Sequence, residues 1–481
     1  MPGFYVENFG CRATQADGAA LERQFEDRGL SRASSPAQAS VVVLNTCTVT
    51  AGADQDARAA IRRVRRQNPD ARIVVTGCYA QRAPEEIGAL PGVDLVVGNS
   101  HKHELAEIAL PHLATESLQS NFVSLERLTH NRVARTEYSP EGAIFVSDIF
   151  AHTELLAAPV FDAANERTRP NLKIQDGCDN RCSFCVIPYV RGQSRSLGLE
   201  RIIDEVKALI RAGYREVVLS GINLGRWGRD LPPREGTAPQ AHVGTAALGR
   251  PGERRPPVSF VDLIRAILAE TPLEKLRISS VEPMDWTDDL ISLMASSPRI
   301  AKHAHVPMQS GSDAVLRRMH RKYRPWHYRD KIEKIRAAMP TAAIGADVMV
   351  GFPGETDVEF ESTRKMVEEL PFTYLHVFTY SARPGTPAAG MPKQLPVHIA
   401  RERNRILREL AAEKKLAFMR TFVGTTLEAI TLNVIGGASD GEFTEALTDN
   451  YLKLRLRGRH HPNRWRTVSV TDLVSGSLSG E

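Results

Sequence analysis

The sequence of 481 residues predicts an α/β protein in three parts. A parallel-sheet α/β domain comes first, a partial (β/α)6 barrel follows in the centre, and a small antiparallel β-barrel comes last. Three observations predict this class. Strand-like runs alternate with helix-like segments through residues 1–145, six further strand–helix units follow within residues 168–410, and short strands joined by Gly, Asn and Asp turns occupy residues 415–475.

The first part contains three strand-like runs that each end just before a cysteine. Cys11 follows the run 4–10, Cys47 follows the run 41–46, and Cys78 follows the run 72–77. Helix-like sequence comes after each thiol. Because open α/β sheets bind ligands at the carboxyl ends of their strands, we expect the three thiols to converge at that edge. For any one of them, a buried unreactive cysteine is the alternative.

The central part should form the partial barrel, with functional residues at the carboxyl ends of its strands. Two segments interrupt the pattern: residues 121–168 are expected to connect the first two parts, and residues 230–257, rich in Pro, Gly and Ala, to form a mobile surface loop. The candidate strands are residues 172–175, 216–220, 275–279, 303–306, 343–350 and 374–380.

In the third part we expect strands at residues 422–430, 443–448 and 451–456, and residues 451–470 carry six Lys or Arg and no acid. Lys453, Arg455 and Arg457 alternate with leucines, so these bases should project from one face of a sheet. With Tyr451 and Trp465 beside it, such a face suits phosphate contact and base stacking. The alternative is an ordinary edge strand protected by its charges.

Cys178, Cys182 and Cys185 form a C-x₃-C-x₂-C run, and the nearest other cysteine lies 100 residues earlier. A structural zinc site takes four ligands. Three thiolates, by contrast, can hold a 4Fe–4S cluster and leave one iron open to chelate a small molecule. A zinc site or a disulfide is the alternative. The N-terminal triad of thiols could hold a second cluster in the same way.

Composition limits the class of protein. The chain is 42% hydrophobic and has no apolar run near the ~18 residues of a membrane-spanning helix. Its first residues show neither a basic region nor an apolar signal core. We therefore expect a cytoplasmic protein without a membrane partner, in a reducing compartment where clustered cysteines indicate metal binding or catalysis. The net charge of +5 identifies no partner by itself.

From end to end, the chain resembles the methylthiotransferase family of radical S-adenosylmethionine (SAM) enzymes, and its last part resembles the RNA-binding TRAM domain. The contexts of Cys11 and Cys178 are most similar to the MtaB branch, which acts on N6-threonylcarbamoyladenosine beside the tRNA anticodon. The matching stretches are residues 8–12, 45–50, 76–81, 178–192, 219–223, 279–283, 305–311, 347–356 and 377–386.

This resemblance implies two 4Fe–4S clusters. One, at Cys178, Cys182 and Cys185, would cleave SAM reductively; the other, at Cys11, Cys47 and Cys78, would carry the sulfur that ends on C2 of the adenine. A second SAM would supply the methyl group. Strand-end residues offer hydrogen bonds to SAM, although any one of them can instead be a helix cap or turn residue. They are Asn223, Ser279, Glu282, Gln309 and Asp347.

The implied product is the 2-methylthio derivative of N6-threonylcarbamoyladenosine at position 37. The implied partners are tRNA, bound in part by Lys453, Arg455 and Arg457, a reducing partner such as flavodoxin or ferredoxin, and a sulfur source. Three alternatives remain: a methylthiotransferase for N6-isopentenyladenosine-37, one for a ribosomal protein, and a non-catalytic iron–sulfur RNA-binding protein. The threonylcarbamoyl carboxylate needs a partner, for which Arg12 and Arg191 are candidates; each could equally pair with a protein acid or a phosphate.

Overall fold

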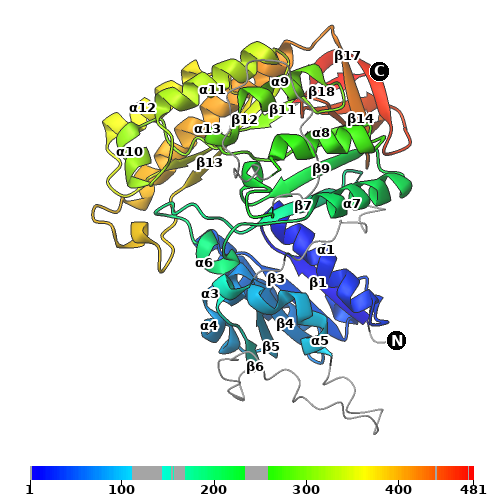
Figure 1. Cartoon of the computed structure of the whole chain (residues 1–481), viewed down its shortest axis with the longest axis vertical. Coiled ribbons are helices and arrows are strands. Elements are labelled where there is room, and N and C mark those ends of the chain that lie inside the picture. The colour runs from blue at the N-terminus through cyan, green and yellow to red at the C-terminus, as the bar shows by residue number, and fades with distance from the viewer. Residues whose placement is uncertain are drawn as a thin grey trace, which may run out of the picture.

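The computed structural model describes residues 3–110, 143–152, 155, 168–232, 258–438, 441–474 and 476–481. Most of the segments expected at 121–168 and 230–257 lies outside these residues. Figure 1 shows the first sheet at one end of the molecule, the partial barrel beyond it and the C-terminal barrel at the far corner. No helix in the described ranges has the length and apolar character needed to cross a membrane.

The first part is a parallel sheet with the strand order β2-β1-β3-β4-β5-β6. Successive side chains of its buried strands point to opposite faces. Phe4, Val41 and Val43 pack with helix α1 and helix α5, whereas Val42 and Leu44 pack with helix α2. Helices therefore cover both faces. The elements are β1 (Gly3–Asn8), α1 (Arg12–Glu26), β2 (Ser31–Arg32), β3 (Val41–Thr46), α2 (Ala51–Gln67), β4 (Arg72–Gly77), α3 (Cys78–Arg82), α4 (Pro84–Gly88), β5 (Leu95–Gly98), α5 (Leu105–Ala109) and β6 (Ala143–Phe145).

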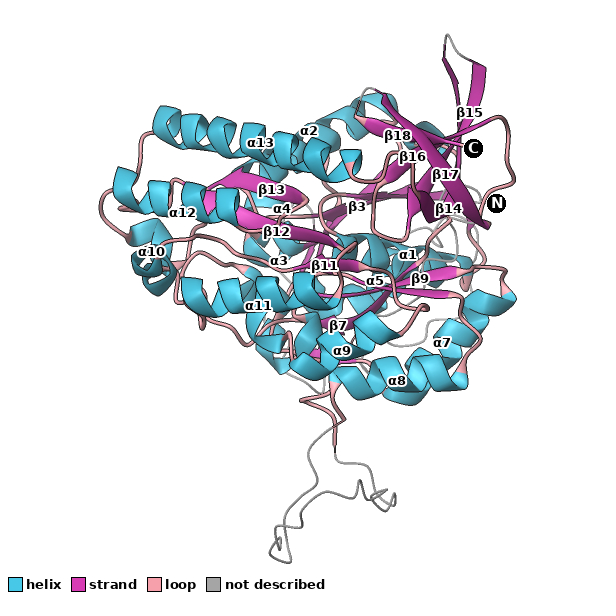
Figure 2. Cartoon of the chain, turned by 90° about the horizontal axis from the view of Figure 1, so that it is seen from above, coloured by secondary structure: helices cyan, strands magenta, loops and turns pink. Residues whose placement is uncertain are grey.

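The central part is the predicted partial barrel, and all six predicted strands are present. Its two sheets, β10-β9-β7-β8 and β11-β12-β13, meet at a bridge between Ser280 and His305, and among the described central strands only β8 runs antiparallel. Helices line the outside (Figure 2). The strands are β7 (Asn171–Asp176), β8 (Arg195–Ser196), β9 (Glu216–Gly221), β10 (Lys275–Ile278), β11 (His303–His305), β12 (Ala343–Val350) and β13 (Tyr374–Thr379). The helices are α6 (Ile187–Arg191), α7 (Leu199–Arg211), α8 (Phe260–Glu270), α9 (Asp288–Ser296), α10 (Asp313–Arg318), α11 (Pro325–Ala338), α12 (Asp357–Glu369) and α13 (Val397–Arg420).

The last part is a closed five-stranded barrel in the order β14-β15-β16-β18-β17. It lies against the amino ends of the central strands, where Asn450 Nδ2 donates to Thr341 O (3.0 Å) and Asn463 Nδ2 donates to Gly213 O (2.6 Å). This is the end opposite the cysteine loop that follows β7. The strands are β14 (Thr426–Ala438), β15 (Gly441–Thr448), β16 (Lys453–Arg457), β17 (Trp465–Val474) and β18 (Ser477–Gly480).

Three details of the predicted barrel are wrong. Residues 422–425 form the turn after α13, so the first strand starts later than expected. Tyr451 is a turn residue with φ +66°, and its ring packs on His303 of the central part at 4.5 Å between centroids. Trp465 also faces the central part, with Lys275 Nζ 5.0 Å from its ring. Neither ring lies beside the basic side chains of β16.

Candidate active site

The N-terminal thiols lie at the carboxyl edge of the first sheet, as predicted. Cys11, Cys47 and Cys78 follow β1, β3 and β4, which are neighbours in that sheet. Gly10, at φ +96°, permits a close approach, since a Cβ there would lie 2.8 Å from Cys47 Sγ. Burial, and then the neighbouring Cys78 thiol, raises the pKa of Cys47 to about 12. The three thiols therefore form one cluster of side chains.

The loop after β7 carries the second group of thiols. Ser183 anchors this loop, because its amide donates to Met319 O (3.1 Å) and its hydroxyl donates to Arg318 O (2.7 Å). Burial, followed by the thiols of Cys182 and Cys178, raises the pKa of Cys185 to about 12, even though an amide hydrogen bond opposes the shift. The C-x₃-C-x₂-C run thus forms a compact group of thiols.

Each group of thiols has side-chain N–H donors directed at sulfur. Asn223 Nδ2 lies 3.6 Å from Cys178 Sγ, Arg321 Nη1 lies 3.3 Å from Cys182 Sγ, and Asn99 Nδ2 lies 3.7 Å from Cys78 Sγ. Such donors orient and tune thiolates that bind a cluster. In the described ranges, no three His, Cys, Asp or Glu side chains are grouped closely enough for a single metal ion. A cluster of four irons spans a wider space, and the donor set of both groups fits one.

Two of the side chains expected to contact SAM have acceptors free for a ligand. Asn223 Oδ1 and Gln309 Oε1 are buried and have no hydrogen-bond partner within the described structure. Gln309 adopts φ +62°, a conformation that costs energy for a residue with a side chain. Unpaired buried acceptors are rare and costly, so these two atoms suit a ligand that donates hydrogen bonds.

Of the other three residues expected to contact SAM, Ser279 is half-buried, and Asp347 and Glu282 lie next to charged or titratable side chains of the protein. Ser279 directly follows β10 and is half-buried. Asp347 lies on β12, with Oδ1 3.5 Å from His305 Nε2. Glu282 forms a short ion pair with Arg321, the same arginine that donates to Cys182 Sγ. Glu282 therefore holds the arginine in position beside the cluster loop.

Several buried groups of this region were not predicted. Ser220 Oγ, His305 Nε2 and Tyr380 Oη lack hydrogen-bond partners in the described ranges, and all three lie on or next to central strands. All three fall inside stretches that match the family, so their strand-end positions could have identified them. Arg321 lies in a basic run, residues 317–324, where no pattern separates it from its neighbours.

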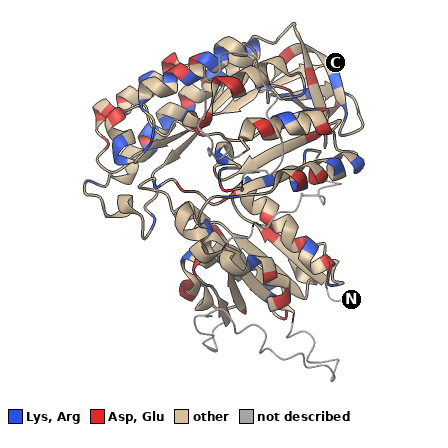
Figure 3. Cartoon of the chain, in the orientation of Figure 1, with Lys and Arg blue, Asp and Glu red and all other residues tan. Residues whose placement is uncertain are grey.

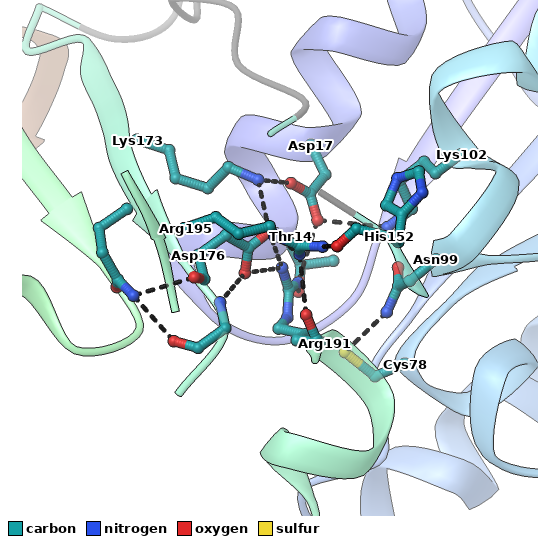
Figure 4. Close-up of polar contacts among 12 residues, drawn as sticks. Thr14, Asp17, Cys78, Asn99, Lys102, His152, Lys173, Asp176, Arg191 and Arg195 are labelled. Atoms are coloured by element: carbon teal, nitrogen blue, oxygen red, sulfur yellow. Dashed lines mark hydrogen bonds and ion pairs between the residues drawn. The ribbon is translucent and has the colours of Figure 1, made fainter. Parts of the chain in front are cut away.

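A buried ionic network connects the two groups of thiols (Figure 4). Asp17 of α1 accepts from Lys102 Nζ (3.2 Å), from Arg191 Nη2 (3.0 Å) and, through a short contact, from Lys173. Lys173 and Arg191 also bind Asp176, at 2.9 Å each. The most exposed side chain of the five is Asp176, at 9%. We call Asp17, Lys102, Lys173, Asp176 and Arg191 the interdomain network.

The interdomain network lies against both cysteine sites. Asp176 precedes the loop of the central thiols, and its Oδ1 accepts from the Gly177 amide at 2.9 Å. On the other side, Thr14 Oγ1 lies 3.5 Å from both Arg191 Nη2 and Cys11 Sγ. Cys78 makes a further contact between the two sites, because it packs on Val186, the residue directly after Cys185, and on Val190.

Arg191 is therefore not available to the substrate. Its side chain is 2% exposed and is bound to both Asp17 and Asp176. The interpretation of Arg191 as a partner for a substrate carboxylate is wrong, because two protein carboxylates already occupy its guanidinium. Arg12 has a different environment: it is half-buried, and its guanidinium donates to Tyr451 Oη at 3.2 Å.

Comparisons with known proteins agree with this architecture. Residues 172–367 match the Radical SAM superfamily, and residues 3–98 match Uncharacterized protein family UPF0004. A solved structure of the radical SAM methyltransferase TsrM from Kitasatospora setae has a TM-score of 0.55 at 15% identity, and the match covers 80% of this chain and 74% of that one. The fold and the thiol loop after β7 thus define a radical SAM enzyme, which uses SAM and a 4Fe–4S cluster.

Curated relatives show which family of radical SAM enzymes the chain resembles. The chain is 35% identical to the threonylcarbamoyladenosine tRNA methylthiotransferase MtaB of Bacillus subtilis, over 93% of this chain and 89% of the relative. It is also 35% identical to the tRNA-2-methylthio-N(6)-dimethylallyladenosine synthase of Nocardia farcinica, over 91% of this chain and 81% of the relative. The chain belongs to the radical SAM methylthiotransferase family, as its motifs predicted.

Proposed function

We propose that this enzyme methylthiolates C2 of N6-threonylcarbamoyladenosine at position 37 of tRNA. The observation that carries the chemistry is the pair of cysteine triads held together by the interdomain network. The similarity to the MtaB enzymes supports the threonylcarbamoyl substrate. A second candidate is the dimethylallyl (isopentenyl) adenosine substrate, since relatives named for it are as identical to this chain.

The two triads would hold two 4Fe–4S clusters, with Cys178, Cys182 and Cys185 at the SAM-binding cluster. SAM bound with its cluster supplies a radical able to remove hydrogen from an unreactive C–H bond, which no side chain can do. The protein's own part is placement. Arg321 and Asn223 would orient the thiolates, and Asn223 Oδ1 and Gln309 Oε1 would accept hydrogen bonds from SAM.

Cys11, Cys47 and Cys78 would hold the second cluster, which supplies the sulfur. The interdomain network fixes this site relative to the loop of Cys178 across a buried interface. A reducing partner such as flavodoxin or ferredoxin, and a source of sulfur, complete the requirements. In this assignment, residues 1–145 hold the second cluster, residues 168–410 bind SAM and its cluster, and residues 415–475 bind RNA.

The substrate assignment predicts a specific change in cellular tRNA. Deletion of the gene should remove 2-methylthio-N6-threonylcarbamoyladenosine and leave its precursor, because no other step forms the C2–sulfur bond in this reaction. Mass spectrometry of nucleosides from tRNA of the two strains measures both compounds. The methylthio derivative of isopentenyladenosine serves as the control and should be unchanged. Loss of that compound instead would identify the second candidate as the substrate.

The basic side chains of β16 should contribute to RNA binding. Lys453 and Arg457 are exposed and Arg455 is half-buried over the ring of Phe443, whereas Leu454 and Leu456 between them are buried. In Figure 3, Lys and Arg alternate with Asp and Glu along many of the helices, and Lys453 Nζ lies 3.9 Å from Glu445 Oε2 on the neighbouring strand. Arg455 and Arg457 also line a surface cavity of about 540 Å³ on the barrel, together with the acids Glu442, Asp472 and Glu481. This face is therefore the candidate for contact with phosphates.

Replacing Lys453, Arg455 and Arg457 together with Ala should weaken tRNA binding and reduce its salt dependence. Each lost phosphate contact should lower the slope of log K against log salt by ~0.7 to 0.9. Titration of tRNA at several salt concentrations measures both effects. Reductive cleavage of SAM without tRNA is the control and should not change. An unchanged affinity and slope would return β16 to the interpretation of an edge strand protected by charge.

A further inference from the structure

Arg12 lies where the first part, the central part and the C-terminal barrel meet. It is the first residue of α1, directly after Cys11, and its side chain extends to Tyr451 in the turn between β15 and β16. That turn is fixed, because Tyr451 donates its amide to Thr448 O at 3.0 Å and Asn450 Nδ2 donates to Thr341 O. Arg12 is thus held between a proposed cluster ligand and the barrel proposed to bind RNA.

The guanidinium of Arg12 has no carboxylate partner in the described structure. Within the described ranges, its side chain makes one hydrogen bond, to the hydroxyl of Tyr451 at 3.2 Å, and takes part in no ion pair within 4.0 Å. Glu216, a buried acid on β9, is shared by two other arginines: Arg277 Nε lies 2.6 Å and Arg169 Nη1 lies 3.7 Å from its Oε1. This corner of the interface therefore carries more positive than negative charge.

Tyr451, whose hydroxyl accepts from Arg12, packs against two rings of the central barrel: its ring lies 4.5 Å from that of His303 and 5.9 Å from that of Tyr374 between centroids. His303 Nε2 lies 2.7 Å from Tyr374 Oη, and the ring of Tyr374 lies 5.4 Å from that of His376 on the same strand. Burial lowers the pKa of His303 well below its ordinary value, and Arg277, His305 and Arg12 add to this effect. Burial and His305 also lower the pKa of His376, although Asp347 opposes the shift. These histidines are therefore neutral near pH 7.

Among the described residues, the barrel wall near Arg12 combines flat rings with an arginine, Arg12 itself, that has no carboxylate partner. His376 is exposed and Tyr374 is half-buried, so both can meet a ligand. Flat rings suit a nucleobase. An arginine without a protein acid suits a carboxylate, through two parallel N–H donors. The acid on this wall, Asp347, lies beside His305 rather than in an ion pair with Arg12.

We propose that Arg12 binds the carboxylate of the threonylcarbamoyl group and thereby selects this nucleoside over adenosines with an uncharged N6 substituent. This inference rests on the proposed function and assigns its specificity to one side chain. The adenine would lie along Tyr374 and His376, and the N6 substituent would point toward α1. A phosphate of the same RNA is the other possible anion for Arg12. If Arg12 binds the threonylcarbamoyl carboxylate, its contribution to binding depends on the N6 substituent. If it binds a phosphate, its contribution is the same for every N6 substituent.

The test uses the full-length enzyme with both clusters and SAM, and three RNA hairpins that differ only at N6 of position 37. The hairpins carry threonylcarbamoyladenosine, isopentenyladenosine or adenosine. For Arg12→Gln, affinity and initial rate on the threonylcarbamoyl hairpin should fall by about tenfold to a hundredfold, as for a lost hydrogen-bonded charge pair. Affinity for the adenosine hairpin should stay within about twofold. Arg12→Lys should lose less affinity for the threonylcarbamoyl hairpin than Arg12→Gln, because lysine keeps the positive charge. It should still lose some affinity, because lysine lacks the two parallel N–H donors.

Two further variants separate recognition from structural damage. Tyr451→Phe removes the hydroxyl that holds Arg12 and should give a smaller loss, again confined to the threonylcarbamoyl hairpin. Arg62→Gln changes an exposed arginine on α2 and should alter nothing. Iron content should be equal in all variants, which shows that Cys11 still functions as a ligand.

The outcomes are distinguishable. An equal loss on all three hairpins would assign Arg12 to a phosphate and overturn this inference, while the proposed function would stand. No loss on any hairpin would overturn it as well. If the unaltered enzyme acts on the isopentenyl hairpin and not on the threonylcarbamoyl hairpin, the proposed function fails, and the inference fails with it.

Discussion

Replacement of Cys182 with alanine is expected to abolish the formation of 5′-deoxyadenosine from SAM. The reason is that the proposed SAM-binding cluster loses one of three ligands, and the remaining thiolates, Cys178 and Cys185, cannot hold a site-differentiated cluster. Arg321 would also lose the sulfur to which it donates at 3.3 Å. Methylthiolation should stop together with SAM cleavage. High-performance chromatography of the nucleoside products measures the effect directly.

Replacement of Cys47 with alanine should stop methylthiolation only. SAM cleavage should continue, but sulfur should no longer reach the RNA, because Cys47 belongs to the other proposed cluster. In each variant the iron content should fall by about half, from roughly eight irons per chain if each triad holds four. Each variant is thus the control for the other, since both remove one cysteine from this chain. Full methylthiolation by Cys47→Ala would contradict the two-cluster proposal.

The positions of the cysteines could be predicted because they follow from local sequence. A β-branched run, a thiol and a helix-like segment fix Cys11, Cys47 and Cys78 at strand ends, and parallel strands bring their ends to one edge. The order of the strands in the first sheet is harder to predict from the sequence. The two-residue strand β2 (Ser31–Arg32) is too short to produce a pattern, and yet it forms the edge beside β1.

Long-range charge pairing could not be predicted. Asp17 lies within an alanine-rich helix, and its partners are 85 to 174 residues away in the chain. Nothing in the local sequence indicates that this acid is buried, so the sequence alone leaves Arg191 equally available to a substrate. Tyr451 illustrates the same limit at a turn. Its place before alternating leucines indicated a strand, but Asn450 and Thr448 close a turn that directs the ring to the central part.

The interdomain network should be a major source of stability at the interface between the first two parts. Three buried cations share two buried carboxylates, so removal of Asp17 leaves Lys102 without its carboxylate and the other two with Asp176 alone. Breaking a buried pair from one side costs about 3–5 kcal/mol, because a charge stays behind in a poorly solvated site. Asp17→Ala should therefore lower the free energy of unfolding by an amount in this range.

Urea unfolding of the metal-free protein measures this loss. Glu402→Ala on α13 is the matched control: Glu402 binds Arg405 on the exposed surface, and its removal should leave the urea midpoint unchanged. The double variant Asp17→Ala with Lys102→Met should be less destabilised than the sum of its single variants, since it removes both members of a pair. Strict additivity would show that Asp17 and Lys102 do not interact energetically.

The contribution of Asp17 should also depend on pH with a definite sign. Burial by itself would raise its pKa, but the charges of Lys102, Lys173 and Arg191 lower it to about 2, from 3.8 in an unfolded chain. A carboxyl group with a lowered pKa stabilises the fold fully above its unfolded value and loses that effect as it becomes protonated. The difference in unfolding free energy between the unaltered protein and Asp17→Asn should therefore be constant near neutral pH. It should shrink as the pH falls from about 4 to about 2. A difference that stays constant through this range would mean that Asp17 titrates normally, and that its cations do not hold it ionised at the interface between the two cysteine sites.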